Sequence, residues 1–229
     1  MAKTALITGA SSGIGKAMSE IHAKKGGNLV IVARSSDTLE QMQSEYEKAY
    51  GISVHVISKD LTDANAAQEI YDEVKHVGIT VDYLINNAGF GGHGKFYERD
   101  WNDDLAMIQL NVIALSALSR KFLPDFVTRN SGKILNVSST ASLMPGPLQA
   151  VYFATKAYVT SFSNALSEEL SDSDVTVTAL LPGATETGFA ETAGMENSKL
   201  FEDTFTAHEV AQTGYEAMLE GKLDVLAGL

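Results

Sequence analysis

A tyrosine and a lysine four residues apart are the side chains of this chain best suited to proton chemistry. Tyr152 and Lys156 follow a hydroxyl pair, Ser138-Ser139, in the same segment. If Tyr152 opens a helix, residues at i and i+4 share one face, so the ammonium lies beside the phenol. Lowering a tyrosine pKa from ~10 to about 7 needs roughly 4 kcal/mol, which the lysine and a cationic cofactor ring could supply together. This pattern predicts a general acid and base for hydroxyl or carbonyl chemistry.

The same spacing has an ordinary alternative. On many amphipathic helices a tyrosine packs against the core while a lysine four residues later is solvated. The pair alone does not decide between these interpretations, so the elements that would position it must.

A glycine-rich turn follows the first predicted strand, residues 4–7. It contains Gly9, Gly13 and Gly15, and apolar residues then recur at helical spacing. Backbone N–H groups at a helix N-terminus attract phosphate, and glycine lets a phosphate approach where a Cβ would block it. A glycine turn between a first strand and a first helix predicts a dinucleotide site.

Arg34 and Ser35 follow the second predicted strand, residues 28–33. A carboxylate about 20 residues beyond the glycines would bind the ribose 2′-hydroxyl of NAD, whereas an arginine suits the 2′-phosphate of NADP. Arg34 comes nineteen residues after Gly15 (34 − 15), and Asp37 lies three residues too late. Although a solvated surface arginine is the alternative, the sequence favours NADP(H) over NAD(H).

Asp60-Leu61 follows the third predicted strand, residues 54–57, where an adenine base would lie. A lone aspartate in a loop is more often a cap or a turn former. Asp63 is an equally good N-cap for the next predicted helix, residues 64–77, which would leave Asp60 free for another task.

Amide side chains mark two further places. Asn86-Asn87 follows the fourth predicted strand, residues 83–85, and small residues after it leave room for a bound ring. Asn111 lies beside the apolar face of a predicted helix over residues 103–120. It lies either at the rim of this helix or in the interior, where it would hold a water.

Composition excludes several classes of function. The 229 residues, 45% hydrophobic and 20% charged, predict one soluble globular domain over 1–229. The net charge of −12 argues against nucleic-acid and anionic-lipid partners. There is no cysteine, and the five histidines are scattered without a carboxylate at ligand spacing, so no metal site is predicted. Lacking a signal peptide or an apolar span, the chain is expected to be cytoplasmic.

Strands and helices alternate throughout, which predicts a parallel sheet covered by helices on both faces. Residues 133–137, 175–181 and 223–226 are expected to be further strands, and 208–220 a helix. Residues 186–206 are expected to form a flexible substrate lid. Its apolar side chains indicate either a hydrophobic pocket or ordinary packing.

The motifs TGASSGIG, NNAG, Asn111, Ser139, Tyr152-x-x-x-Lys156 and Pro182-Gly183, in this order, resemble the short-chain dehydrogenase/reductase (SDR) family along nearly the whole chain. The resemblance implies an α/β Rossmann fold of three layers, with a doubly wound parallel sheet of about seven strands in the order 3-2-1-4-5-6-7. It also implies a homodimer or homotetramer. Because the family usually continues past a segment like 223–229, we expect a truncated or disordered C-terminus at Leu229.

The resemblance further implies roles for individual residues. Tyr152 would pass a proton to or from the substrate oxygen, and Lys156 would lower the Tyr152 pKa and hold the nicotinamide ribose. Ser139, thirteen residues before Tyr152 (152 − 139), would bind the substrate carbonyl. Asn111 would place a water that links Lys156 to solvent. The implied cofactor contacts are Gly9, Ser11, Ile14, Gly15, Arg34, Ser35, Asp60, Leu61, Asn87, Tyr152, Lys156, Pro182, Gly183 and Thr187.

Two functions of different classes follow. The first is an NADP(H)-dependent oxidoreductase that interconverts a secondary alcohol and a ketone or aldehyde, with a small-molecule substrate. The second is a nucleotide-binding regulatory or scaffold protein that kept this fold without turnover. The complete set of Asn111, Ser139, Tyr152 and Lys156 favours the enzyme, because a protein without turnover has no need to keep it.

Overall fold

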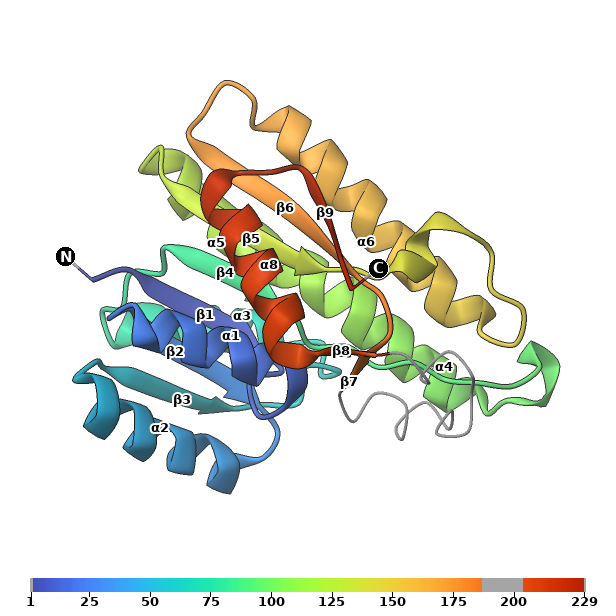
Figure 1. The fold of residues 1–229 in the computed structure, drawn as a ribbon, viewed down its shortest axis with the longest axis horizontal. Coiled ribbons are helices and arrows are strands. Elements are labelled where there is room, and N and C mark those ends of the chain that lie inside the picture. The colour runs from blue at the N-terminus through green and yellow to red at the C-terminus, as the bar shows by residue number, and fades with distance from the viewer. Residues whose placement is uncertain (1, 187–203, 229) are drawn as a thin grey trace.

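The computed structural model describes residues 2–186 and 204–228, in which strands and helices alternate along the chain (Figure 1). The strands of the main sheet are β1 (Thr4–Thr8), β2 (Asn28–Ala33), β3 (Val54–Ser58), β4 (Tyr83–Asn86), β5 (Gly132–Val137), β6 (Val175–Pro182) and β9 (Asp224–Ala227). The α-helices are α1 (Gly13–Lys24), α2 (Ser36–Tyr50), α3 (Ala66–His76), α4 (Trp101–Ile108), α5 (Leu115–Thr128), α6 (Ala150–Glu169) and α8 (Ala207–Glu220).

All neighbouring strands of the 7-stranded sheet are parallel, in the order β3-β2-β1-β4-β5-β6-β9. Since β9 is the seventh strand of this sheet along the chain, the predicted order and the predicted three-layer Rossmann fold are confirmed. Each predicted strand agrees with the observed one to within about one residue at either end.

Helices cover both faces of the sheet. In Figure 1, α1, α2 and α8 lie on the near side, where they share one apolar cluster with strand residues such as Ile31 and Leu135. A second cluster on the other face joins α3, α5 and the carboxyl end of α6 around Phe122 and Phe126. Strand β1 is buried at every position, as an apolar strand between two helical layers must be.

Local signals determine where α8 begins and ends. The Thr206 hydroxyl accepts a hydrogen bond from the Glu209 backbone N–H, and the Glu209 carboxylate accepts one from the Thr206 N–H at 3.0 Å, which together form a capping box. The helix ends at Gly221, whose φ of 70° is left-handed and therefore suits glycine. The chain then enters β9 beside β6.

The predicted helix over residues 103–120 contains an interruption. Between α4 and α5 lies a π-helical segment, Gln109–Ala114 (η2), so the helix is longer than predicted and changes its period in the middle. π-helical turns are rare and occur frequently at functional sites. This one contains Asn111, which is buried.

The segment predicted as a lid, residues 186–206, begins and ends in a small second sheet. Thr185–Glu186 (β7) pairs in parallel with Phe205–Thr206 (β8). Residues 187–203, including Thr187 of the predicted cofactor contacts, lie outside the described residues, so the lid stays a prediction. In the part of the chain that is described, no helix has the length and apolar character needed to cross a membrane.

Candidate active site

The glycine turn after β1 is packed against the loop that follows β4. The Asn87 side-chain amide donates to the Thr8 carbonyl at 2.9 Å, and the Asn87 backbone N–H donates to the Thr8 hydroxyl at 3.0 Å. A Cβ at Gly15 would overlap the Gly9 carbonyl and the Asn87 amide, and Gly9 itself has a φ of 65°. The hydrogen bonds of Asn87 therefore fix the glycine turn against the loop that follows β4.

The first turn of α1 has no side-chain cap from its N-cap residue. Its N-cap residue, Ser12, makes no side-chain capping bond, so the first backbone N–H groups of α1 receive no cap from it. Ser11 and Ile14 belong to the same turn, and their contact with a pyrophosphate stays a prediction. This donor set fits the pyrophosphate of a dinucleotide.

Arg34 and Ser35 lie at the carboxyl end of β2, next to this turn. The Ala10 N–H donates to the Val32 carbonyl at 3.3 Å, which joins the glycine turn to β2. Arg34 is exposed, and Ser35 is the N-cap residue of α2 but makes no side-chain capping bond. Both side chains are thus positioned to meet a group bound beside the turn.

Asp60 has a local task that the sequence analysis did not assign to it. Its carboxylate accepts from the Thr62 backbone N–H at 2.9 Å and from the Thr62 hydroxyl at 2.8 Å, and these bonds lower the Asp60 pKa. Asp63 does not cap α3, which begins at Ala66 after Asn65. The prediction that Asp60 is left free was therefore wrong, because the loop uses it to form a turn. Leu61 is buried in the core behind it.

Ser139 and Ser138 point in different directions at the end of β5. The Ser139 hydroxyl is hydrogen-bonded to the Tyr152 side chain and accepts from the Ala141 N–H at 3.1 Å, which caps a short 3-10 helix, Thr140–Leu143 (η3). The Ser138 hydroxyl instead donates to the Lys156 backbone carbonyl at 2.9 Å. The serine chosen from the sequence is the one in contact with the tyrosine.

Lys156 lies beneath the tyrosine, one turn further along α6. Its Nζ donates to the Val137 carbonyl at 2.9 Å and lies 5.8 Å from the centre of the Tyr152 ring. Both side chains are buried, with relative exposures of 8% for Tyr152 and 6% for Lys156. The two residues therefore share one face of α6, as their spacing predicts.

Burial determines the pKa shifts of Tyr152 and Lys156 in the protein alone. Burial raises the pKa of Tyr152 to about 12, and the hydrogen bond with Ser139 opposes this only in part. Burial also lowers the pKa of Lys156 to about 8. The Lys156 ammonium is directed to the Val137 carbonyl, and the lowering of the Tyr152 pKa by Lys156 together with a cationic cofactor ring stays a prediction.

Asn111 lies in the interior rather than at the rim. Its side-chain amide accepts from the Phe90 N–H at 3.1 Å and donates to the Phe90 carbonyl at 2.9 Å and to the Thr155 hydroxyl at 3.1 Å. A Cβ at Gly89 would lie 2.9 Å from the Asn111 Oδ1 and 3.5 Å from the Lys156 Nζ. Asn111 and Lys156 thus both border Gly89.

The last predicted cofactor contacts lie at the end of β6. Pro182 is the final residue of this strand, and the Gly183 N–H donates to the Ala227 carbonyl at 2.8 Å. A Cβ at Gly183 would overlap the carbonyl of Gly228. Glycine is needed here because the chain passes directly over the end of β9.

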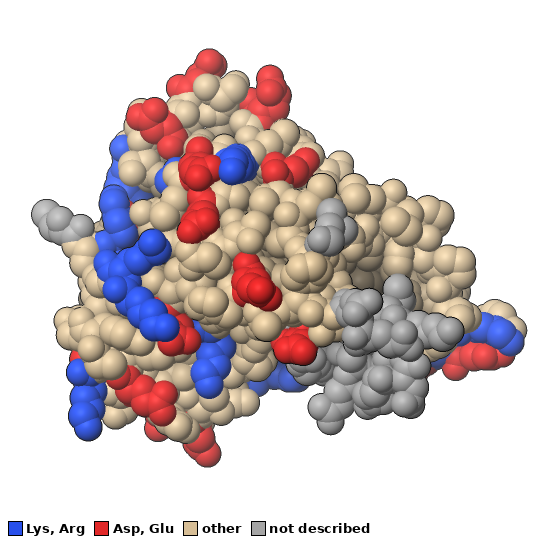
Figure 2. All heavy atoms as spheres, in the orientation of Figure 1, with Lys and Arg blue, Asp and Glu red and all other residues tan. Residues whose placement is uncertain are grey.

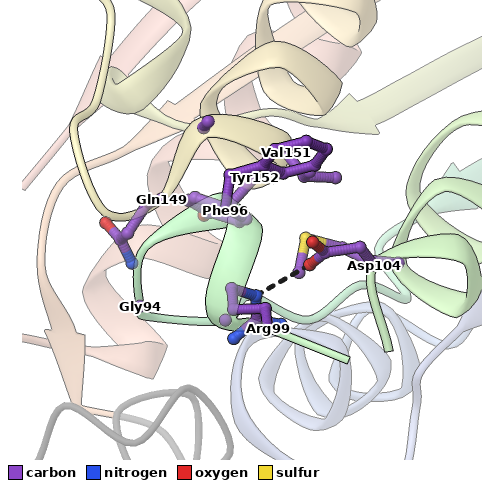
Figure 3. Close-up of a pocket in the computed structure, with 10 residues that line it drawn as sticks. Gly94, Phe96, Arg99, Asp104, Gln149, Val151 and Tyr152 are labelled. Carbon is purple, nitrogen blue, oxygen red and sulfur yellow. Dashed lines mark hydrogen bonds and ion pairs between the residues drawn. The ribbon is translucent and has the colours of Figure 1, made fainter. Parts of the chain in front are cut away.

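A pocket beside Tyr152 contains an ion pair that the sequence analysis missed (Figure 3). The Arg99 Nε lies 2.8 Å from a carboxylate oxygen of Asp104, which is almost fully buried. An arginine and an aspartate five residues apart in a polar stretch carry no distinctive pattern.

One histidine has a carboxylate partner in space. His55 Nε2 lies 2.9 Å from a carboxylate oxygen of Glu73, a residue too distant in the sequence for ligand spacing to indicate the pair. The pair is on the surface between β3 and α3. Among the described residues, no group of three or more His, Asp or Glu side chains is arranged to hold a metal ion.

Comparison with known proteins adds four similarities. A family model described as short chain dehydrogenase matches residues 3–198. The chain is 32% identical over 225 residues to the human very-long-chain 3-oxoacyl-CoA reductase, which covers 96% of this chain and 71% of that protein.

Among solved structures, a short-chain dehydrogenase from Sphingobium yanoikuyae in complex with NADPH is similar, with a TM-score of 0.91 and 31% identity over 98% of this chain and 87% of that one. A short-chain dehydrogenase/reductase from Burkholderia phymatum in complex with NAD has a TM-score of 0.88 and 27% identity, over 98% of this chain and 88% of that one. Proteins of this fold with either cofactor are therefore similar to this chain.

Proposed function

The chain belongs to the short-chain dehydrogenase family of oxidoreductases, and on that basis we propose that it is an NADP(H)-dependent enzyme that interconverts a ketone or aldehyde and the corresponding alcohol. In this proposal Tyr152 is the acid and base, Ser139 binds the substrate oxygen, and Lys156 and Asn111 support them.

One observation carries the proposal. The Tyr152 side chain and the Ser139 hydroxyl are hydrogen-bonded to each other at the carboxyl edge of the sheet, with the Lys156 ammonium under the tyrosine ring. Ligands of open parallel sheets bind at this edge. Two hydroxyl groups that converge there provide a site for a carbonyl oxygen.

The residues present fit a nicotinamide dinucleotide. The first turn of α1, to which Ser12 gives no side-chain cap, suits the pyrophosphate, and Arg34 with Ser35 suits a 2′-phosphate. When bound, this cofactor supplies or accepts the hydride. The chain contributes the rest: Ser139 donates a hydrogen bond to the carbonyl oxygen, and Tyr152 delivers a proton to the same oxygen as it becomes an alkoxide.

The tyrosine pKa favours the reductive direction at neutral pH. With a pKa raised to about 12 by burial, the phenol of Tyr152 is protonated at physiological pH and ready to donate. Alcohol oxidation needs the phenolate form of Tyr152, and a phenol with this raised pKa is very little ionised at that pH. We therefore expect ketone reduction to be the faster reaction near pH 7.

The test is a panel of aldehydes, ketones and secondary alcohols, assayed with NADPH, NADP⁺ and their non-phosphorylated forms by the absorbance of the reduced nicotinamide. Substrate-dependent consumption of NADPH supports the proposal. Tight NADPH binding with no turnover of any member of a broad panel would instead favour the regulatory or scaffold protein.

Arg34→Asp is expected to reverse the cofactor preference. A charge-assisted bond from arginine to a phosphate oxygen contributes about 1.5–3 kcal/mol, so the ratio of kcat/KM for NADPH over NADH should fall by roughly 10- to 100-fold or more. A carboxylate at this place repels the phosphate and can accept from a ribose hydroxyl. Steady-state kinetics with both cofactors measures the ratio.

The matched control is Lys48→Asp, which makes the same change of charge at the far end of α2. It should leave the cofactor ratio unchanged. An unaltered ratio in the Arg34 variant would show that Arg34 does not bind the phosphate.

We also propose a homodimer formed through α5 and α6. Tyr158 on α6 is 41% exposed, stacks on Phe162 with ring centres 5.6 Å apart, and is bonded through its hydroxyl to Ser116 of α5 at 3.0 Å. Ile113 nearby is 48% exposed. Figure 2 shows that the surface over α6 is almost free of charged side chains, apart from its carboxyl end.

Light scattering at micromolar concentration should therefore give about twice the chain mass of 24.5 kDa. Phe162→Glu should produce monomers, because a carboxylate buried at an interface is strongly unfavourable. Val77→Glu, at an exposed apolar residue after α3, is the control and should remain dimeric. A wild-type protein that is monomeric at this concentration contradicts the proposed interface.

A further inference from the structure

Arg99 and Asp104 form one wall of the pocket beside Tyr152. In Figure 3 they lie on one side of the pocket, with Gln149 and Tyr152 on the opposite side. The side chains of Arg99 and Asp104 are 17% and 2% exposed, and 2.8 Å separates the Nε from the carboxylate oxygen. A charged pair this well buried is part of the architecture of the pocket.

Arg99 has more N–H donors than the hydrogen bonds that it donates to the described residues. A guanidinium has about five N–H groups and no acceptor. Within the described residues, Arg99 uses its Nε toward Asp104 and its Nη1 toward the His93 carbonyl at 3.0 Å. A Cβ at Gly92 would overlap Nη2, so glycine at this position gives the guanidinium its room. The remaining N–H groups belong to a side chain that lines the pocket.

We propose that Arg99 is a specificity-determining residue that binds a second carbonyl oxygen of the substrate, and that the substrate is an oxo ester or thioester with an apolar remainder. The inference rests on the proposed function, since it assigns the oxygen reduced to Tyr152 and Ser139 and the second oxygen to Arg99. Arg99 touches the substrate in this scheme but takes no part in the proton transfer.

The charges of Arg99 and Asp104 favour an uncharged hydrogen-bond acceptor, rather than a carboxylate, as the group that binds Arg99. Asp104 compensates the guanidinium, so the pocket wall carries no net charge from this pair. A free carboxylate bound at Arg99 would lie close to a second carboxylate in a poorly solvated place, which is unfavourable. An ester or thioester carbonyl accepts the same hydrogen bonds without this repulsion.

Apart from Gln149 and Tyr152, the other side chains that line the pocket are apolar. Met107 and Val151 line it together with Phe96, which belongs to a short 3-10 helix, Phe96–Glu98 (η1), and is 58% exposed. These side chains offer contact to a hydrocarbon group but no hydrogen bond. The pocket thus places Arg99 and Tyr152 in one lining with several apolar side chains, which suits an oxoacyl compound.

A purely structural role is the competing explanation, since Arg99 also ties the loop at His93 to α4. Removing Arg99 alone would leave the buried Asp104 charge unpaired and endanger folding. The test variant is therefore the double substitution Arg99→Gln with Asp104→Asn, which removes both charges and keeps polar groups in their places. Thermal melting and NADPH titration establish that it is folded.

The experiment compares ethyl 3-oxobutanoate with 2-hexanone, a ketone of similar size without the ester. In the wild type, kcat/KM should be at least about tenfold higher for the oxo ester, and the ratio of the two values should fall about tenfold or more in the double variant, mainly through KM. Arg129→Gln, an arginine bonded to the Val81 carbonyl far from the pocket, is the control and should leave the ratio unchanged. Equal losses for both substrates would overturn the inference.

Two further measurements separate this inference from the proposed function. Asp104→Asn alone leaves the guanidinium uncompensated and should raise kcat/KM for the free acid, 3-oxobutanoate, relative to the ester; no change would count against Arg99 as the binding group.

Diethyl malonate, a diester that is not reduced, should bind the protein–NADPH complex in calorimetry at least about tenfold more weakly after the double substitution. If neither ethyl 3-oxobutanoate nor 2-hexanone is turned over but the double variant binds diethyl malonate more weakly than the wild type, the proposed function fails while recognition by Arg99 stands. Equal binding of diethyl malonate by the two proteins overturns the inference.

Discussion

Replacing Tyr152 by phenylalanine is expected to lower kcat/KM for ketone reduction by about 10²- to 10⁴-fold, the usual contribution of a positioned general acid. The substitution removes only the hydroxyl that is hydrogen-bonded to Ser139. The ring remains to pack against Met107 and Ala141, so the fold and the NADPH affinity should be nearly unchanged. Steady-state kinetics and a fluorescence titration of NADPH measure the two quantities separately.

The matched control is Tyr158→Phe, six residues further along the same helix. The Tyr158 hydroxyl is bonded to Ser116 on the surface, away from the site, so its loss should leave the rate unchanged. If Tyr152→Phe keeps its activity and loses NADPH binding, the proposed role of Tyr152 is wrong.

Lys156→Met should combine a loss of activity with a gain in stability. Without the ammonium, we expect kcat/KM to fall by roughly 100-fold, because charge-assisted bonds to the bound cofactor are lost. The folded protein nevertheless bears a cost for the buried charge: the pKa falls from 10.5 to about 8, which corresponds to on the order of 3 kcal/mol. Methionine removes this cost and loses about 1 kcal/mol for the hydrogen bond to Val137.

The effect on stability should depend on pH in a defined direction. Below pH 8 both the folded and the unfolded chain carry a protonated Lys156, so the cost is fully present. Between about pH 8 and 10.5 the folded state loses this proton first, the unfolded state binds more protons, and wild-type stability rises relative to the variant. The variant should thus melt about 4–8 °C higher near pH 7, with the difference shrinking toward pH 10.

Lys133→Met provides the control for this substitution. Lys133 lies near the start of β5, at the opposite end of the strand from the site, and its pKa is also lowered by burial. It should keep full activity. A Lys156 variant that is less stable than the wild type near neutral pH would contradict the account of the buried charge.

The fold was predictable because its strands carry their own signal. In a sheet covered on both faces, each strand is a short apolar run, and β1, β2 and β6 stand out from the polar helices around them. Alternation with helices then restricts the topology to a few solutions. The π-helical segment at Gln109–Ala114 was not predictable, because its one extra residue per turn leaves the apolar pattern of the flanking helices intact.

The positions of site residues could be predicted where the chemistry requires one residue type at one spacing. Properties that depend on how deeply a side chain is buried could not be predicted. Tyr152 and Lys156 share a helix face, so their proximity follows from the sequence. The direction of the Tyr152 pKa does not, because it depends on how far the phenol is removed from water. In the same way, the turn formed by Asp60 and the pairing of Arg99 with Asp104 depend on loop conformations that spacing does not specify.

The central claim is that the substrate oxygen is bound between the hydroxyls of Tyr152 and Ser139. A crystal structure of the protein with NADP⁺ and a ketone or an inert ketone analogue tests this most directly. The account predicts the ketone oxygen within about 2.6–3.2 Å of both the Tyr152 and the Ser139 hydroxyl oxygens, with the nicotinamide beside it. A ketone oxygen bound away from both hydroxyls, with the nicotinamide in place, would contradict the account.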